Sequence, residues 1–305
     1  MSADTATTRI GDGAALQPGA NVVLCADDFA MTDGVSRGIE ELALARRLSA
    51  TSAIVTLPGF EQHARRLAEL RSFVAIGLHI NLTLGAPLAP MPGLAPDGEL
   101  PDHTDLVRMA LMGRVVKAEI AAEIERQFAR FEEGTGFMPD FIDGHQHVHT
   151  LPGIRAAVLD VLARRQSRFR PLVRDPVDGL SAILHRRAGA HKALAIALLS
   201  RGFGARARAA GFPTNHGFSG VSAFDMDSRY EGELEAFFER PGRRHLVMCH
   251  PGYADPVLAD LDSVVARRHQ ELDALFAMPR LDEAIWHVRR RADGPPVDWQ
   301  EALPV

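Results

Sequence analysis

The sequence is poor in cysteine and contains no long apolar run. Its 305 residues include only two cysteines, Cys25 and Cys249, each inside an apolar, strand-like stretch. This pattern excludes the disulfide framework of a small secreted domain and predicts two buried, reduced thiols. The densest apolar stretch is ALAIALL at 193–199. It is far shorter than the ~20 residues of a membrane-spanning helix, so we expect no transmembrane segment.

The first residues also lack the features of a targeting segment. Residues 1–20 contain neither a basic start nor an apolar core, so we predict a disordered tail there and, by default, a cytoplasmic location. The formal net charge of −5 gives no electrostatic reason to expect nucleic acid as a partner. Five arginine pairs are interpreted as solvated helix faces: Arg46-Arg47, Arg65-Arg66, Arg164-Arg165, Arg186-Arg187 and Arg267-Arg268.

Short apolar runs alternate along the chain with longer segments of helical periodicity. The expected strands are residues 22–26, 50–56, 73–79, 140–143, 169–173, 215–219, 245–250 and 296–299. The clearest helix covers 116–132, where apolar residues recur at helical spacing and Gly134 and Gly136 follow. This alternation predicts parallel strands joined by right-handed crossovers.

The number of these units indicates one α/β domain over 21–300, an incomplete or distorted (β/α) barrel with mostly parallel strands. The alternative is an open doubly wound sheet. Such sheets often carry a glycine-rich phosphate loop after the first strand, and this chain has ADDFAMTDG there instead. The barrel is therefore favoured.

Two stretches depart from the simple alternation. Residues 81–113 carry APLAPMPGLAPDGELP, which predicts an irregular loop that walls a binding site. Residues 179–211 are rich in Ala, Leu and Arg and predict one or two helices. Packing of these helices onto the barrel is the simpler interpretation, and contact with a membrane surface or a lipid-linked substrate is the alternative.

Polar residues stand at the carboxyl ends of several expected strands. Asp27 and Asp28 follow the first, His79 ends the third, Asp143 ends the fourth and His250 ends the seventh. In a parallel barrel these ends form the active-site face. Adjacent carboxylates emerging from a buried strand are costly unless a cation offsets their charge. His250, at a Pro-Gly turn, suits a general acid.

The run DGHQHVH, residues 143–149, strengthens the metal interpretation. If the strand continued, Asp143, His145, His147 and His149 would project to one side. Three histidines in five residues indicate a metal site rather than a surface loop. A single ion does not need all of them, so some are expected to orient a ligand or carry a proton.

Two histidines and a carboxylate leave positions on a divalent cation for water and substrate. Such a site suits hydrolysis of an amide or ester without a covalent intermediate. No G-x-S-x-G motif occurs, and neither cysteine has an activating neighbourhood, so nucleophilic catalysis is disfavoured. Another metal-dependent hydrolase, such as an esterase or phosphoesterase, and a noncatalytic sugar-binding protein are the alternatives.

The motifs resemble those of the YdjC-like (ChbG/HpnK) carbohydrate deacetylases. The matching pieces are VVLCADDFAMTDGVSRGI, SATSAIVT, IGLHINLTLGAPL, MPDFIDGHQHVHTLP and VMCHPGYAD. The resemblance spans about 21–299 and is weakest over 175–211. It implies a β/α barrel and removal of N-acetyl groups from amino sugars such as chitooligosaccharides.

The resemblance also implies residue roles. Asp28, His79 and His145 would bind one divalent ion; the family association is with Mg²⁺, whereas the ligand types favour Zn²⁺. Asp27 would be the general base. Ala30 stands where the family usually has Gly, and we expect no positive φ at this position.

The substrate is expected to be a small carbohydrate or a glycolipid with an N-acetylglucosamine-type residue. Residues 214–220 (TNHGFSG) are expected to wall the site with the 81–113 loop. Asn81 and Asn215 could offer hydrogen bonds to a sugar, and Phe218 an apolar surface or a packing contact. A homodimer is one option for the oligomeric state.

Overall fold

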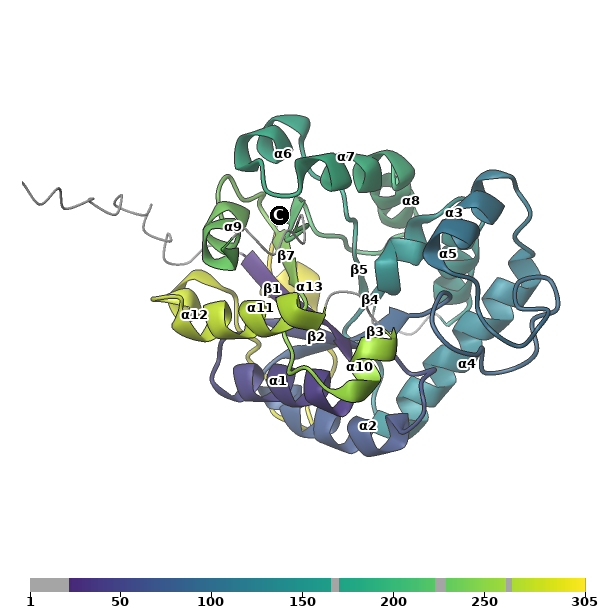
Figure 1. Ribbon diagram of the computed structural model, residues 1–305, viewed down its shortest axis with the longest axis horizontal. Helices are drawn as coiled ribbons and strands as arrows, with labels where there is room; N and C mark the ends of the chain where they lie inside the picture. The colour runs from purple at the N-terminus through teal and green to yellow at the C-terminus, as the bar shows by residue number, and fades with distance from the viewer. Residues whose placement is uncertain (1–21, 166–169, 223–228, 262–264, 305) are drawn as a thin grey trace, which may run out of the picture.

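The computed structural model describes residues 22–165, 170–222, 229–261 and 265–304. These residues form one α/β unit in which helices surround a curved sheet (Figure 1). The predicted tail over 1–20 and Phe169, within the predicted fifth strand, lie outside the described residues. The tail and the domain boundaries at 21 and 300 therefore stay predictions.

Seven parallel strands form a single sheet in the order β5-β4-β3-β2-β1-β7-β6. Their bounds are β1 (Val22–Phe29), β2 (Ala50–Ala53), β3 (Ala75–Ile80), β4 (Phe141–Gly144), β5 (Leu172–Val173), β6 (Phe218–Ser219) and β7 (His245–Cys249). Consecutive strands are neighbours from β1 to β5, β7 pairs with both β1 and β6, and the sheet curls into a half-barrel. Val173 forms one further parallel bridge with Thr214, ahead of β6. The predicted incomplete barrel is confirmed, and the doubly wound alternative is wrong.

The strands separate two apolar layers. In β1, Leu24 and Ala26 belong to the layer between sheet and helices, whereas Val23 and Cys25 belong to the layer inside the half-barrel. Burial on both faces explains why the strands appear in the sequence as continuous apolar runs. Cys25 and Cys249 are buried and not disulfide-bonded, as predicted.

Helices follow the strands along the chain, and the last four come after β7. They are α1 (Asp33–Leu44), α2 (Phe60–Glu69), α3 (His103–Leu111), α4 (Lys117–Thr135), α5 (Ile154–Arg164), α6 (Leu180–Arg186), α7 (Ala190–Leu199), α8 (Phe203–Ala209), α9 (Tyr230–Phe237), α10 (Pro256–Leu261), α11 (Val265–Ala277), α12 (Leu281–Ala284) and α13 (Trp299–Ala302), with short 3₁₀ helices η1 (Leu70–Ser72) and η2 (His145–Thr150). The helix predicted over 116–132 is α4, which ends at Gly136 with φ 80°.

The strand predicted over 296–299 is wrong. Within the described ranges this stretch joins no strand and leads into α13. Trp299 is buried, packs edge-on against Phe141, and its indole N–H donates to the carbonyl of Asp140 at 2.7 Å. Arg244 donates to the carbonyl of Trp299 at 2.8 Å. Asp140 and Arg244 precede β4 and β7, so this apolar segment closes the amino-terminal end of the half-barrel interior.

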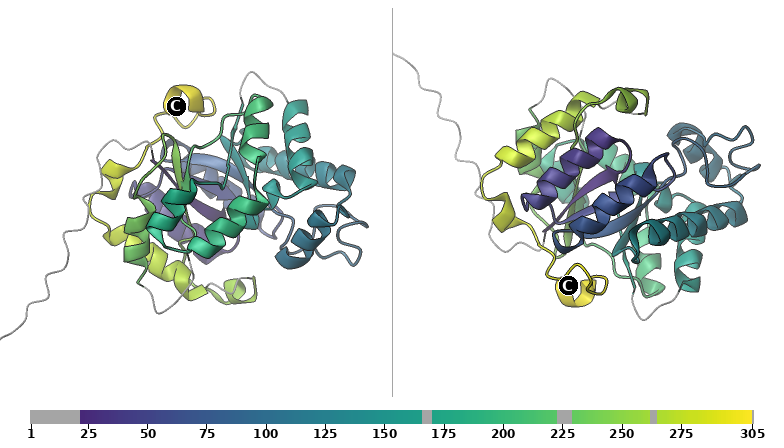
Figure 2. Two further views of the ribbon diagram at one scale, coloured as in Figure 1. Left: turned by 90° about the horizontal axis from the view of Figure 1, so that it is seen from above. Right: turned by 90° about the horizontal axis from the view of Figure 1, so that it is seen from below.

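The 81–113 and 179–211 stretches form separate parts of the carboxyl-terminal end of the half-barrel. In the 81–113 segment the proline-rich stretch 86–101 forms no helix or strand, as predicted, and α3 follows it. The predicted helices of 179–211 are present as α6, α7 and α8, which lie along one edge of the molecule in Figure 1 and stay together in Figure 2. Among the helices of the described ranges, none has the length and apolar character needed to cross a membrane.

Candidate metal and catalytic site

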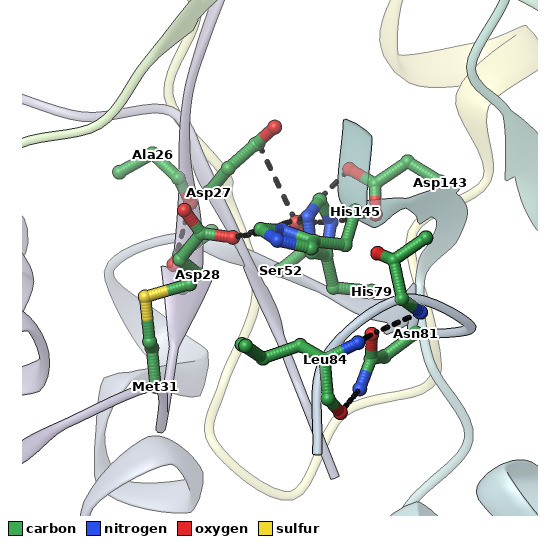
Figure 3. A network of polar contacts seen from close by, with 12 residues as sticks. Ala26, Asp27, Asp28, Met31, Ser52, His79, Asn81, Leu84, Asp143 and His145 are labelled. Atoms are coloured by element: carbon green, nitrogen blue, oxygen red, sulfur yellow. Dashed lines mark hydrogen bonds and ion pairs between the residues drawn. The ribbon is translucent and has the colours of Figure 1, made fainter. Parts of the chain in front are cut away.

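Asp28, His79 and His145 meet at the carboxyl ends of β1, β3 and β4. Oδ1 of Asp28 lies 3.2 Å from Nε2 of His79 and 2.9 Å from Nδ1 of His145. Figure 3 shows these three side chains pointing toward one another. One ligand atom from each lies within 4.8 Å of the other two. Two imidazole nitrogens and one carboxylate oxygen are a donor set that fits a first-row divalent ion.

A left-handed backbone turn brings Asp28 to this point. By strand alternation Asp28 would share the outer face of Leu24 and Ala26. Its φ of 71° instead turns the side chain toward the interior, and its carbonyl accepts a hydrogen bond from Met31 N at 3.0 Å. Asp adopts this conformation more readily than most residues.

Ala30 has the same unusual conformation, with φ 68°. The expectation of an ordinary φ at this position is therefore wrong. A Cβ in the left-handed region costs roughly 1–2 kcal/mol, and Gly would avoid that cost. The backbone N–H of Ala30 donates to Ser36 Oγ at 3.0 Å, which fixes the turn against α1.

Ala30→Gly is expected to leave the thermal midpoint unchanged or raise it by a few degrees. The relieved strain exceeds the extra conformational freedom that Gly gives the unfolded chain, ~0.4–1 kcal/mol. Ala53 is the matched control, because it is also fully buried but has no positive φ. Ala53→Gly should lower stability by roughly 0.5–1 kcal/mol. Scanning calorimetry checks both, and equal destabilisation by the two changes would contradict the strain argument.

Asp143 supports His79 from behind. The two residues are neighbours in the β3–β4 register, so their side chains share a face. Oδ1 of Asp143 lies 2.7 Å from Nδ1 of His79, and Ser52 Oγ donates to Oδ2 of Asp143 at 2.9 Å. Burial opposes a charge on His79, but the carboxylates of Asp143 and Asp28 outweigh it and raise its pKa to about 10. A carboxylate behind a ligand imidazole is typical of metal sites.

Asp27 is held by Arg174, which follows β5. Both guanidinium Nη atoms of Arg174 lie 2.6 Å from oxygens of Asp27, and Nη2 lies 2.5 Å from Asp143. Burial would raise the pKa of Asp27, but Arg174 holds it below its usual range. Cys25, Asp27 and Asp143 also form a group of suitable ligands. The Arg174 guanidinium already supplies the positive charge there, so we favour the Asp28 group for a metal ion.

Arg268 of α11 binds the other oxygen of Asp28, with Nη2 to Oδ2 at 2.6 Å. The two oxygens of Asp28 are thus divided, Oδ2 to the guanidinium and Oδ1 to the histidines. Both Arg267 and Arg268 are buried, so the interpretation of this pair as a solvated face is wrong. Arg186 is buried as well and pairs with Asp178 at 2.6 Å.

The histidine run does not continue β4. The strand ends at Gly144, and Gln146 and His147 take left-handed backbone angles in η2. The predicted alternation is therefore wrong. His145 and His147 both line the cavity described below, but the Nε2 of His149 donates to the carbonyl of Arg174 at 2.9 Å and its ring packs on Phe203.

A cavity of about 460 Å³ opens over these groups. Asp27, Asp28, His79, His145 and His250 line one part, which places the proposed base and acid beside the candidate metal ligands. The rest of the cavity lining is mainly apolar and includes residues of α7. The residues lining this apolar part are Leu151, Ala195, Ile196, Leu199, Val221 and Met248. Ligand sites are commonly of this size and character.

The YdjC-like protein family matches residues 21–284. The chain belongs to this family. This YdjC-like chain is 31% identical to the chitooligosaccharide deacetylase of Enterobacter sp. (strain 638) over 266 residues, 87% of this chain and 93% of that protein. It is 28% identical to the carbohydrate deacetylase of Geobacillus stearothermophilus, covering 83% and 88% of the two chains. The predicted family is thus confirmed.

A solved structure has the same fold. The crystal structure of an Enterococcus faecalis V583 protein named for cleavage of cellobiose phosphate matches with a TM-score of 0.63. The match covers 86% of this chain and 92% of that one, at 21% identity. At this identity the likeness concerns the fold alone.

Three predicted substrate residues of this YdjC-like protein lie outside the cavity lining. Asn81 donates to Thr56 and to the carbonyl of Leu84, and Figure 3 shows it turned toward its own loop. Asn215 binds the backbone of Asp175 and Gly217. Phe218 is buried, and its ring packs edge-on against His147. The structure therefore gives these three residues packing and loop-fixing contacts.

Sequence reasoning missed several residues that line or support the site. Arg174 follows the predicted fifth strand directly, so the strand-end rule that selected Asp27 would also have selected it. His103 lines the cavity from α3, in the 81–113 segment that was predicted to wall the site. Lys192 lines it from α7, in the 179–211 segment that was predicted to pack on the barrel or to contact lipid. Arg268 had no signal of this kind, because it lies within a helix far along the chain.

Proposed function

We propose that the protein is a metal-dependent carbohydrate N-deacetylase. The observation that carries this proposal is that Asp28, His79 and His145 converge in one part of the cavity lining, beside Asp27 and His250. Membership of the YdjC-like family and the names of its relatives support the activity. One divalent ion per chain, Zn²⁺ or Mg²⁺, is part of the proposal.

Each side chain then has a distinct task. A divalent cation at Asp28, His79 and His145 would polarise the amide carbonyl and lower the pKa of a nearby water molecule. Asp27, kept ionised by Arg174, takes the proton of the water that attacks the carbonyl carbon. His250 gives a proton to the leaving amine as the C–N bond breaks. The products are acetate and a free amino sugar.

The substrate is proposed to carry a terminal or near-terminal N-acetylglucosamine-type residue. The cavity of about 460 Å³ has room for one or two sugars rather than for a long polymer. Its apolar part lies against α7, through Ala195, Ile196 and Leu199. A lipid-linked acetylamino sugar would use this wall, whereas a short chitooligosaccharide would not need it.

Acetate and amine release from two substrates tests the proposal. Diacetylchitobiose and an acetylglucosaminyl lipid are compared by kcat/KM under the same conditions. Turnover of either supports the deacetylase, and a higher kcat/KM on the lipid supports a role for the α7 wall. If neither releases acetate while a simple ester or phosphoester is hydrolysed, the alternative metal hydrolase replaces the proposal. If none of the four reacts, the noncatalytic alternative does.

The cytoplasmic location and the homodimer stay predictions.

A further inference from the structure

Helix α7 has an unusual combination of composition and exposure. Apart from His191 and Lys192, all of its residues are apolar, yet none of the ten is buried. A helix that is apolar on all sides normally lies in a protein core or in lipid. Leu198 is 71% exposed, and in the preceding helix Leu180 and Leu184 are 61% and 53% exposed.

The same segment is strongly basic. Residues 179–211 contain six Lys and Arg residues and no Asp or Glu, although the whole chain has a net charge of −5. Four of these cations are exposed, and one of them, Arg208, donates to Thr214 Oγ1 at 2.8 Å. The other three are Arg187, Arg201 and Arg206. None of these three has an ion pair with the described residues. Exposed leucines and arginines thus occur together on α6, α7 and α8.

We propose that this surface docks on an anionic lipid bilayer. We call it the α6–α8 face; it comprises Leu180, Leu184, Arg187, Leu198, Arg201 and Arg206. Exposed apolar side chains that enter the lipid interface, with cations beside anionic headgroups, are the features of interfacial membrane binding. The helices lie side by side along one edge of the molecule (Figures 1 and 2).

Charge distinguishes the bilayer from a second copy of the chain. A symmetric dimer through the α6–α8 face would place Arg187, Arg201 and Arg206 against the same residues of its partner. Like charges facing each other oppose association. An anionic bilayer complements them instead.

The docked orientation would also place the cavity at the membrane. Lys192, Ala195, Ile196 and Leu199 recur at helical spacing and line the cavity. Leu198 follows on the adjacent exposed side of the same helix. Helix α7 would therefore contact the lipid with one side and line the cavity with another, so that a substrate entering the cavity from the membrane passes along it. The docking itself does not depend on the proposed activity.

Co-sedimentation with vesicles tests the proposal on the full chain. Vesicles of phosphatidylcholine alone are compared with vesicles that also contain phosphatidylglycerol, at low and at high NaCl. The wild type should bind the anionic vesicles, bind the neutral ones much less, and be released by salt. Absence of binding to the anionic vesicles at low salt would overturn the proposal.

Two independent variants locate the surface. Leu198→Ser with Arg201→Glu, and Leu184→Ser with Arg187→Glu, should each weaken binding roughly tenfold or more, because each reverses one cation and removes one apolar contact. Circular dichroism and the thermal midpoint identify any variant that fails to fold. In that case the vesicle binding of the other variant tests whether the α6–α8 face is the docking surface.

A control on the opposite side carries the same chemical changes. Leu44 and Arg65 are exposed residues of α1 and α2, which Figure 1 places at the lower edge of the molecule. Leu44→Ser with Arg65→Glu should bind like the wild type. Equal loss in the control, or wild-type binding by both test variants, would overturn the assignment. A third result would also overturn the assignment: a wild type that sediments as a dimer and a Leu198/Arg201 variant that sediments as a monomer. The α6–α8 face would then be a self-association surface.

Discussion

Asp27→Asn is expected to bind metal and substrate and to lose kcat by ~10²–10⁴-fold, the usual contribution of a general base. Asn keeps the size of the side chain but cannot take the proton of the attacking water. Arg174 remains paired with Asp143 at 2.5 Å in the variant, so its charge is not left alone in the interior. The fold should therefore persist.

Asp175→Asn is the matched control for this experiment. Asp175 directly follows Arg174, but it is not among the residues that line the cavity. Its carboxylate lies toward Gly204 of α8, so the change should leave kcat within a few-fold of wild type. Steady-state rates of acetate release and metal content are measured for both variants. Near wild-type turnover of Asp27→Asn would remove Asp27 from the mechanism.

His250→Ala should have a different signature. Loss of the group that protonates the leaving amine alters the alkaline side of the pH–rate profile, where the acid form of a general acid is depleted. The measurement is kcat against pH for the variant and the wild type. A profile of unchanged shape would exclude His250 as the acid.

The sequence was most informative where a strand ends. Parallel strands with both faces buried appear as apolar runs, so the first polar residue after each run marks the catalytic end of the barrel. Asp27, His79, Asp143 and His250 were found in this way, and the structure brings all four to one region.

The sequence was less informative where the backbone leaves regular geometry. Nothing in it indicates that Asp28 and Ala30 adopt positive φ, although that turn is what directs Asp28 toward His79. The same applies to η2, where left-handed residues break the alternation and separate His149 from His145. Trp299 shows a related limit, because an apolar segment that closes a barrel end has the composition of a strand.

Local sequence patterns also could not predict the long-range contacts that residues in helices make. Arg268 lies 240 residues from Asp28, and a pair of arginines in a helix normally indicates a solvated face. Its burial depends on how α11 packs against α1 and α9. Only the position of that helix reveals that the Asp28 carboxylate is shared between a guanidinium and the two histidines.

His79→Ala and His145→Ala are each expected to lose most of the bound metal. Purified wild-type protein should carry about one divalent ion per chain, the number that a three-ligand mononuclear site holds. Removing either imidazole leaves two ligands, one of which is the Asp28 carboxylate shared with Arg268. Asp143→Asn should weaken metal binding by a smaller amount, about 10–100-fold, because it only orients His79 and raises its basicity.

His147→Ala is the control from the same histidine run. His147 also lines the cavity, but it is not part of the Asp28–His79–His145 group, so its loss should leave the metal content unchanged. Elemental analysis and calorimetric titration measure stoichiometry and affinity. The raised pKa of His79, about 10, adds a second expectation. A proton and a metal ion compete for this site, so the affinity should rise with pH as binding releases the proton. Full metal occupancy in both ligand variants would refute this ligand set, whatever the catalytic activity of the wild type.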